Sequence, residues 1–157
     1  MSENKSKLAI IVPCYNEELV VKSTVETLLG VLDSIIAKGK ISDESYIYLV
    51  DDGSKDRTWE IIEELHNIYG KRVKAVKFVR NYGNQKALIA GLLGVKKIGC
   101  DCVVSIDADL QQDENVIETF IDEKLLSVVF AIEEPFTTNC TSSLDANSIL
   151  TSTQWVA

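Results

Sequence analysis

The side chains with the clearest chemical potential are two aspartates one residue apart, Asp107 and Asp109, which follow the apolar run 102–106. Two carboxylates this close repel each other unless a cation or hydrogen-bond donors compensate their charge. Mg²⁺ or Mn²⁺ takes oxygen ligands and commonly shares them with a diphosphate, where the ion neutralises charge on a departing nucleoside diphosphate. Such a D-x-D pair also occurs by chance in many loops, so its meaning depends on its neighbours.

Three further polar segments follow apolar runs in the same way: 13–17 (PCYNE), 51–54 (DDGS) and 80–86 (RNYGNQK). Ligands of an open parallel sheet bind outside the carboxyl ends of its strands. We therefore expect these segments to lie with Asp107 and Asp109 along one edge of a sheet and to form one site.

The elements that position these segments alternate along the chain. Short β-branched runs indicate strands, and apolar residues that recur with helical spacing indicate helices. The predicted strands are 8–12, 46–50, 73–79 and 102–106, and the predicted helices are 17–38, 56–69, 85–98 and 114–125. Small residues of the third helix allow close approach to a sheet: Ala87, Ala90, Gly91 and Gly94. This alternation predicts an α/β fold, a Rossmann-like, doubly wound and mostly parallel sheet.

Several polar residues have two interpretations. Asp51 and Asp52 suit a turn completed by Gly53, but Asp52 also suits an acceptor for a base N–H. Arg80 and Lys86 are either solvated cations or partners of a bound diphosphate. The only histidine, His66, lies within the second predicted helix, so a Ser-His-Asp or Cys-His site has little support.

Composition and charge exclude several classes of function. The 157 residues suit one domain, and no apolar run approaches the roughly 20 residues that span a bilayer. The N-terminus lacks a signal-peptide core, so we expect a cytoplasmic protein with reduced cysteines. The net charge is −8. Residues 1–97 carry 15 basic and 13 acidic side chains, whereas residues 98–157 carry one basic and 11 acidic side chains. The chain lacks the basic stripe of nucleic-acid-binding domains.

The last part of the chain differs in character from the rest. The final 33 residues contain no Lys or Arg, ten of them are Ser or Thr, and helical and strand periods disappear after residue 132. We therefore divide the chain into a domain at 1–124 and an atypical tail at 125–157. Our hypothesis is that this tail comes from a truncated or frameshifted gene.

Four strings resemble the motifs of glycosyltransferase family 2, which has the GT-A fold: LAIIVPCYNEE, VDDGSKDRT, FVRNYGNQKALIAGL and SIDADLQQDEN. Within that family they are most similar to polyprenyl-phosphate sugar transferases of the dolichyl-phosphate mannose synthase and bactoprenol glucosyltransferase type. The similarity covers residues 7–124. It implies that the domain is the N-terminal, nucleotide-sugar-binding half of a GT-A fold.

The resemblance also implies roles for individual residues. It assigns Asp109 and Gln111 to the metal, Mg²⁺ or Mn²⁺, and to the diphosphate. The residues that it assigns to the nucleotide sugar are Pro13, Tyr15, Glu17, Val50, Asp52, Arg80, Lys86, Asp107 and Ala108. In these relatives a sugar passes from UDP or GDP to a polyprenyl phosphate, with inversion at the anomeric carbon. The bactoprenol likeness favours UDP over GDP.

The sequence departs from these relatives after Lys124. They continue with an acceptor-side half, a carboxylate that assists attack and often membrane-associated helices, and none of these is recognisable here. We therefore expect the catalytic base to lie outside this chain, and the intact enzyme to work at the cytoplasmic membrane surface. Donor binding without transfer is the consequence for the chain itself.

Two other functions remain as alternatives. A non-catalytic nucleotide-binding fragment would contain every one of these motifs. A response-regulator receiver is also a small doubly wound domain, but its acidic pair follows strand one and its lysine follows the last strand. Here 13–15 is Pro-Cys-Tyr and Lys86 precedes Asp107, so the order disagrees. Neither the dinucleotide glycine fingerprint nor a P-loop is present.

Overall fold

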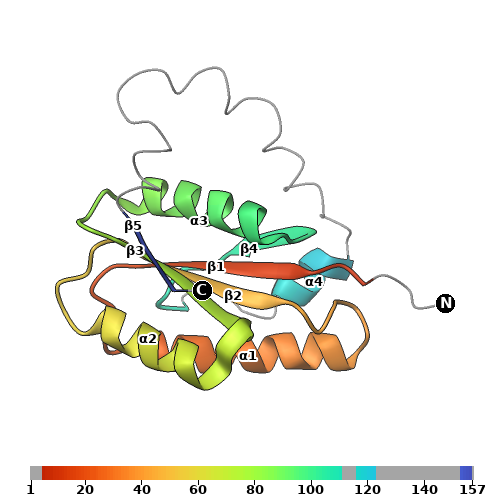
Figure 1. Cartoon of the computed structure of the whole chain (residues 1–157). Helices are drawn as coiled ribbons and strands as arrows, with labels where there is room; N and C mark the ends of the chain where they lie inside the picture. The colour runs from red at the N-terminus through yellow and green to blue at the C-terminus, as the bar shows by residue number, and fades with distance from the viewer. Residues whose placement is uncertain (1–4, 111–115, 123–152, 157) are drawn as a thin grey trace, which may run out of the picture.

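The strands form one sheet in the order β4-β1-β2-β3-β5 (Figure 1). The computed structural model of the chain describes residues 5–110, 116–122 and 153–156. The strands β1 (Leu8–Cys14), β2 (Tyr46–Asp51), β3 (Val73–Phe78) and β4 (Cys102–Ser105) run parallel to one another. The last strand, β5 (Thr153–Val156), pairs antiparallel with β3.

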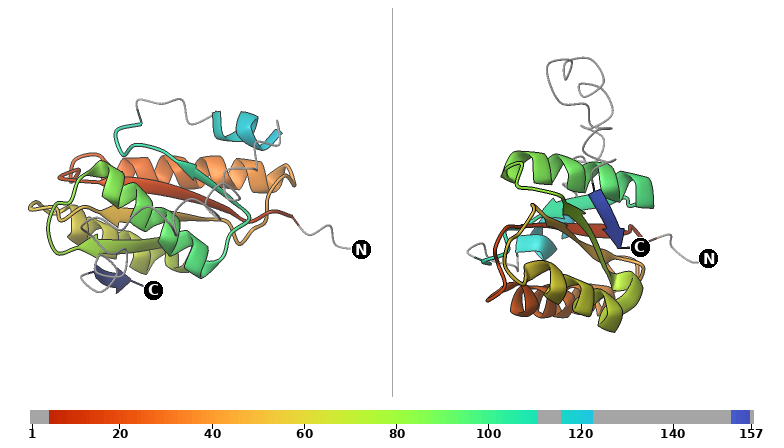
Figure 2. Two further views of the ribbon diagram at one scale, coloured as in Figure 1. Left: turned by 90° about the horizontal axis from the view of Figure 1, so that it is seen from above. Right: turned by 60° about the vertical axis from the view of Figure 1, so that its left-hand side comes forward.

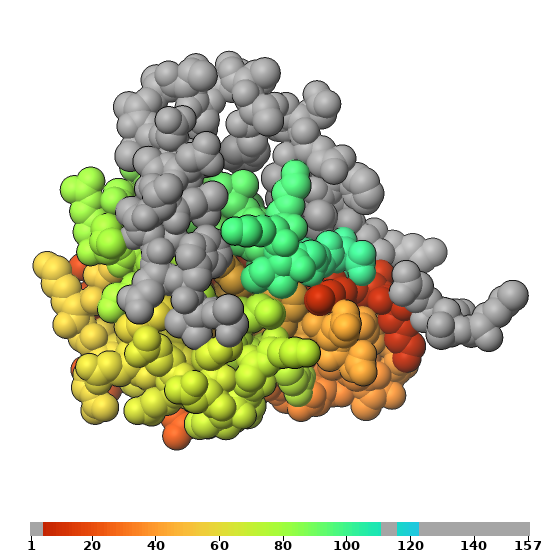
Figure 3. Space-filling view, viewed as in Figure 1, coloured from red at the N-terminus to blue at the C-terminus, as the bar shows by residue number. Residues whose placement is uncertain are grey.

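Helices cover both faces of this sheet (Figures 1 and 2). The helices α1 (Val21–Ala37) and α2 (Thr58–Tyr69) lie on one face, and α3 (Asn84–Ile98) lies on the other. The short helix η1 (Gly70–Arg72) leads into β3, and α4 (Val116–Asp122) follows β4 in the chain. The side chains of α1 and α2 form one continuous surface on the side opposite α3 (Figure 3). The predicted α/β, doubly wound and mostly parallel class is confirmed.

Strand alternation divides the core into two layers. Successive strand residues point to opposite faces of a sheet. Accordingly Ile10 and Leu49 belong to the cluster that packs under α1 and α2, whereas Ile11 and Tyr48 belong to the cluster under α3. All six residues of β2 are buried, because the strand is central and covered on both faces.

The small residues of α3 bring that helix close to the sheet, as predicted. A Cβ on Gly91 would lie 2.7 Å from Cγ2 of Ile11, and a Cβ on Gly94 would lie 2.3 Å from the hydroxyl oxygen of Tyr48. Non-bonded carbon atoms pack at about 3.5–4.0 Å, so neither position has room for a side chain. Glycine at these two positions therefore sets the spacing between α3 and the sheet.

The first two helices begin later than predicted. The first was expected from residue 17, but residues 17–20 form a turn and α1 starts at Val21. The cause lies in Asn16, whose φ is +55°, and in the amides of Glu17 and Glu18, which donate to side chains at the start of α2 and just before it. The second helix was expected from Asp56, which instead accepts the N–H of Thr58, the first residue of α2, at 3.0 Å.

The end of the chain also differs from the expectation. No element was predicted after residue 132, yet β5 pairs with β3 over the register Ala75–Val156 to Phe78–Thr153. An edge strand such as β3 offers unpaired backbone groups, which a further strand can satisfy. The rest of the predicted tail at 125–157 lies outside the described residues, as do residues 114, 115 and 123–125 of the last predicted helix.

Ion pairs attach α4 to the end of α1. Nζ of Lys38 and Nζ of Lys40 each lie 2.7 Å from carboxylate oxygens of Glu118, and Lys40 also pairs with Asp122 at 2.7 Å. These pairs keep α4 beside the C-terminal end of α1. Within the described part of the chain, no helix combines the length and the apolar character needed to cross a membrane.

The close approach of α3 predicts opposite effects for two glycine-to-alanine changes. We expect Gly94→Ala to lower the free energy of unfolding by about 1–3 kcal/mol, because the new methyl group overlaps the buried Tyr48 ring. The control is Gly30→Ala in α1, where nothing lies within 4 Å of the added Cβ. That change should stabilise the protein by up to about 1 kcal/mol through helix propensity. Urea denaturation measures the free energy of unfolding of both variants. Changes of the same sign in the two variants would contradict the packing argument.

Candidate functional site

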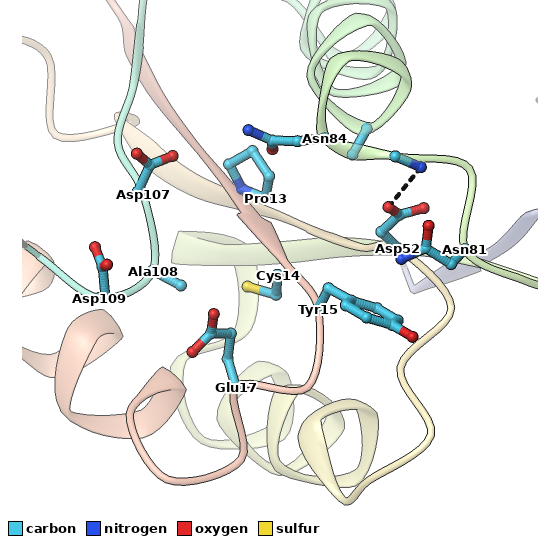
Figure 4. Close-up of a pocket in the computed structure, with 12 residues that line it drawn as sticks. Pro13, Cys14, Tyr15, Glu17, Asp52, Asn81, Asn84, Asp107, Ala108 and Asp109 are labelled. Atoms are coloured by element: carbon cyan, nitrogen blue, oxygen red, sulfur yellow. Dashed lines mark hydrogen bonds between the residues drawn. The ribbon is translucent and has the colours of Figure 1, made fainter.

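A pocket of about 390 Å³ lies at the carboxyl ends of the parallel strands (Figure 4). The chain leaves β3 through α3 and returns to β4 on the far side of β1, so the strand order reverses between β1 and β4. Ligands of doubly wound sheets bind at such a switch point. The lining residues come from all four predicted polar segments and, with Ala87, from α3: Pro13, Cys14, Tyr15, Glu17, Asp52, Asn81, Gly83, Asn84, Ala87, Asp107, Ala108 and Asp109.

Asp52 joins the segment after β2 to the segment after β3. Its Oδ1 accepts the N–H of Tyr82 at 2.7 Å. Its Oδ2 accepts the N–H of Gly83 at 2.9 Å, the bond dashed in Figure 4. Only 3% of Asp52 is exposed. The two amide donors give each oxygen of this buried carboxylate a hydrogen-bond partner. Asp52 therefore fixes the loop that carries Asn81 and Gly83 into the pocket wall.

Gly53 allows these two segments to touch. Its φ is +68°, and a Cβ there would lie 2.2 Å from the carbonyl carbon of Arg80 and 2.6 Å from the nitrogen of Asn81. Both the left-handed conformation and the contact with backbone atoms require glycine. The position of the loop after β3 thus depends on two consecutive residues, Asp52 and Gly53.

Two cations, Arg80 of the loop after β3 and Lys86 of the first turn of α3, lie around Tyr82. The guanidinium carbon of Arg80 lies 4.8 Å from the centre of the Tyr82 ring, and Nζ of Lys86 lies 5.9 Å from it. The ring of Tyr82 also packs edge-on against Phe78, with centroids 5.5 Å apart. Cations within about 6 Å of an aromatic face are attracted by the ring quadrupole. Arg80 and Lys86 therefore lie beside the pocket and are not among its lining residues.

The aspartate pair forms a short turn held by α1. Ala108 is 3% exposed, and its carbonyl oxygen accepts a hydrogen bond from the hydroxyl of Thr24, a buried residue of α1. The N–H of Leu110 donates to the carbonyl of Asp107 at 3.2 Å and closes the turn. Because Ala108 is buried between them, Asp107 and Asp109 are both exposed at the pocket rim.

Electrostatic coupling links Glu17 to this turn. Burial raises the pKa of Glu17 above its ordinary value, and the charges of Asp109 and Asp56 raise it further. Burial, with the charges of Asp51 and Glu17, also raises the pKa of the Cys14 thiol, so Cys14 is no nucleophile at neutral pH. The pocket is consequently a site of concentrated negative charge that favours a cation.

A divalent ion fits these residues only with help from a ligand. Among residues 5–110, 116–122 and 153–156, no group of three His, Cys, Asp or Glu side chains could hold a metal ion. Mg²⁺ is commonly bound by one or two carboxylates together with substrate phosphates and waters. The carboxylate of Asp109, coupled to Glu17, is suited to that mode of binding.

The predicted site residues divide into four groups. Those that line the pocket are Pro13, Tyr15, Glu17, Asp52, Asp107, Ala108 and Asp109. Val50 is fully buried beneath α3, where a Cβ on Gly91 would lie 3.2 Å from its Cγ2. Arg80 and Lys86 lie beside the pocket around Tyr82. Gln111 lies outside the described residues.

Five lining residues were given no individual role in binding from the sequence: Cys14, Asn81, Gly83, Asn84 and Ala87. Three of them come from the turn before α3 and from its first residue. The available signal was the pair of amide side chains at Asn81 and Asn84 in the string RNYGNQK, directly after a predicted strand. The residues predicted from that string were its two cations, Arg80 and Lys86.

Comparison with known proteins identifies the family. The chain matches glycosyl transferase family 2 over residues 9–127 and belongs to that family. The uncharacterized glycosyltransferase YkoT of Bacillus subtilis is 47% identical over 121 residues, which are 77% of this chain and 35% of YkoT. The undecaprenyl-phosphate 4-deoxy-4-formamido-L-arabinose transferase of Edwardsiella ictaluri is 36% identical over 115 residues, 73% of this chain and 33% of the relative. The chain thus spans about a third of these relatives.

Solved structures place the fold among GT-A enzymes, as the four motifs predicted. TarS 1–349 of S. aureus matches with a TM-score of 0.53 and 27% identity over 74% of this chain and 32% of the 1–349 chain. The same protein has been crystallised in complex with UDP. The mannosyltransferase PcManGT of Pyrobaculum calidifontis, solved with GDP-Man and Mn²⁺, shares the fold at a TM-score of 0.53 and 23% identity, over 72% of this chain and 30% of PcManGT.

The contact at Gly53 predicts a local loss of structure. We expect Gly53→Ala to lower the free energy of unfolding by more than the roughly 1–2 kcal/mol of left-handed strain, because its methyl group also displaces Arg80. The amides of Tyr82 and Gly83 should then exchange with solvent faster. Gly70→Ala is the matched control, since Gly70 has a φ of +56° but nothing within 4 Å of an added Cβ. Equal effects of the two changes on these amides would refute the contact.

The coupling of Glu17 to Asp109 predicts a shift in titration. We expect Asp109→Asn to lower the pKa of Glu17 toward its ordinary value, because one of the charges that disfavour its ionised form is removed. Asp107→Asn is the control, since Asp107 is not among the charges that raise this pKa. NMR titration of the side-chain carboxyl carbons measures both variants. An unchanged pKa of Glu17 in the Asp109→Asn variant would show that the two carboxylates do not interact.

Proposed function

We propose that this chain provides the donor-binding site of a glycosyltransferase that passes a sugar from a nucleotide-sugar donor to a polyprenyl phosphate with inversion. The observation that carries the proposal is the single pocket at the switch point, where Glu17, Asp52, Asp107 and Asp109 come together from three strand ends. Membership of glycosyl transferase family 2 supports the reaction class. The name of the Edwardsiella ictaluri relative supports a polyprenyl phosphate as acceptor, and the TarS complex supports UDP.

In this proposal different residues bind different parts of the donor. The nucleoside lies against Pro13, Tyr15 and Glu17, with Val50 as the buried floor behind them. Asp52 lines the same wall and keeps lone pairs for a base N–H beside the two amides that it already accepts. Asp107 and Ala108 contact the nucleotide. Asp109, together with Gln111, holds Mg²⁺ or Mn²⁺ at the diphosphate.

The reaction itself is a direct displacement. An oxygen of the acceptor phosphate attacks the anomeric carbon as the bond from that carbon to the diphosphate breaks, and a base supplied by another part of the protein assists. A bound divalent ion would neutralise charge on the leaving diphosphate. Arg80 and Lys86 would move from the Tyr82 ring, or extend past it, to contribute further positive charge. Because the acceptor is a membrane lipid, we propose that the whole protein works at the cytoplasmic face of a membrane.

Binding without turnover is the second candidate function. It uses the same pocket and the same carboxylates, and it differs only in the acceptor step. Measuring transfer to a polyprenyl phosphate separates the two, whereas donor binding is common to both.

Titration calorimetry with UDP and GDP, each with and without Mn²⁺, tests donor binding. We expect binding that requires the metal, and Asp109→Ala should weaken it at least about tenfold, which corresponds to about 1.4 kcal/mol. Glu26→Gln is the control, because Glu26 is an exposed acid of α1 that does not line the pocket. Equal affinity in the presence and absence of metal would count against the role of Asp109.

A further inference from the structure

Three consecutive backbone amides after β1 donate to side chains of residues 54–58, which lead into the first residue of α2. The N–H of Asn16 donates to Oγ of Ser54 at 2.9 Å. The N–H of Glu17 donates to Oγ1 of Thr58 at 2.8 Å, and the N–H of Glu18 donates to Oδ2 of Asp56 at 3.2 Å. We call the three acceptors Ser54, Asp56 and Thr58 the amide clamp.

The hydroxyl of Ser54 has a fixed direction. A hydroxyl has one hydrogen to donate, and that of Ser54 goes to Oδ1 of Asp51, which also accepts the N–H of Ser54 at 3.1 Å. The lone pairs of the hydroxyl are therefore left for the N–H of Asn16. Because Asp51 is fully buried at the end of β2, this chain of bonds ties the loop to the rigid centre of the sheet.

Thr58 is oriented in the same way. Its hydroxyl donates to Oδ1 of Asp56 at 2.6 Å, so that a lone pair faces the N–H of Glu17. Thr58 is the first residue of α2 and is fully buried. Its position is thus set by the helix, and the amide of Glu17 is held relative to α2.

The clamp holds a backbone conformation that the loop would not otherwise favour. Asn16 has a φ of +55°, which is uncommon outside glycine, and its own Oδ1 accepts the N–H of Lys55 at 2.9 Å. Tyr15 and Glu17, on either side of Asn16, both line the pocket. Release of Asn16 into a commoner conformation would change the direction of both neighbours.

We propose that Ser54, Asp56 and Thr58 are positioning residues, which prepare Tyr15 and Glu17 to receive a nucleoside diphosphate by fixing the three amides at 16–18. None of the three lines the pocket, so they act through the loop and not by contact with the ligand. A preformed site binds more tightly because less freedom is lost on binding. The ligand in this inference rests on the proposed function.

Ser54→Ala, compared with Ser45→Ala, tests the inference. Oγ of Ser45 accepts the N–H of Leu8 at 3.0 Å and donates to the carbonyl of Ser42 at 2.7 Å, so it makes the same kind of bond at the opposite end of β1. We expect Ser54→Ala to weaken the binding of UDP with Mn²⁺ by about five- to tenfold, and Ser45→Ala to change it less than about twofold. Equal losses of affinity, or no loss in Ser54→Ala, would overturn the proposal.

Amide hydrogen exchange of the ligand-free protein gives a second readout, which does not depend on the ligand. We expect the amides of Glu17 and Glu18 to exchange at least about tenfold faster in Ser54→Ala than in Ser45→Ala, although their own acceptors remain. Unchanged exchange overturns the positioning role. If the wild-type chain binds neither UDP nor GDP, the proposed function fails, and the exchange rates still decide whether the clamp fixes the loop.

Thr58 offers a rescue experiment within the same design. Thr58→Val removes the acceptor but keeps the shape, whereas Thr58→Ser keeps the hydroxyl. We expect Thr58→Val to weaken UDP binding about tenfold and Thr58→Ser to stay within about threefold of the wild type. If the two variants lose affinity equally, the packing of Thr58 matters and its hydrogen bond to Glu17 does not.

Discussion

The structure of the pocket depends on how residues 51–58 bind the backbone amides of the loops on both sides. Because strand side chains alternate, Asp51 points with Leu49 toward α1 and α2, and Asp52 points with Val50 toward α3. Asp51 therefore supports the bonds to the loop after β1, while Asp52 accepts two amides from the loop after β3. A one-residue shift of this strand would exchange the two faces and break both sets of bonds.

Some acids around the pocket build the site through hydrogen bonds, and others are placed to contact a ligand. Asp52 and Asp56 accept backbone amides or hydroxyls, and the hydrogen bonds to Asp56 lower its pKa in spite of its burial. The raised pKa of Glu17 shows the opposite situation, because burial and the charge of Asp109 both oppose its ionisation. A cation between these carboxylates would relieve that repulsion, which is why the acidic rim suits a charged, metal-bound ligand.

Much of the fold could be predicted from the sequence because it follows from periodicity. The β-branched runs at 8–12 and 46–50 locate the two central strands, and the helical spacing in 85–98 locates α3 to within one residue. Local spacing does not show which way a side chain points after a strand ends. The bonds of Asp52 to Tyr82, and of Ser54 to Asn16, join residues far apart in the chain and became visible only in three dimensions. The late start of α1 has the same origin.

The helix α1 connects the two acidic parts of the pocket. It begins four residues after Glu17, and one turn later its Thr24 binds the carbonyl of Ala108. Glu17 and Asp109 are thus placed relative to each other by one rigid element, whose far end is in turn paired to α4 through Lys38 and Lys40. A flexible loop could let the two carboxylates move apart and reduce their repulsion. With α1 between them the backbones of these two residues are held in place, and a cation bound between the carboxylates would neutralise their charge.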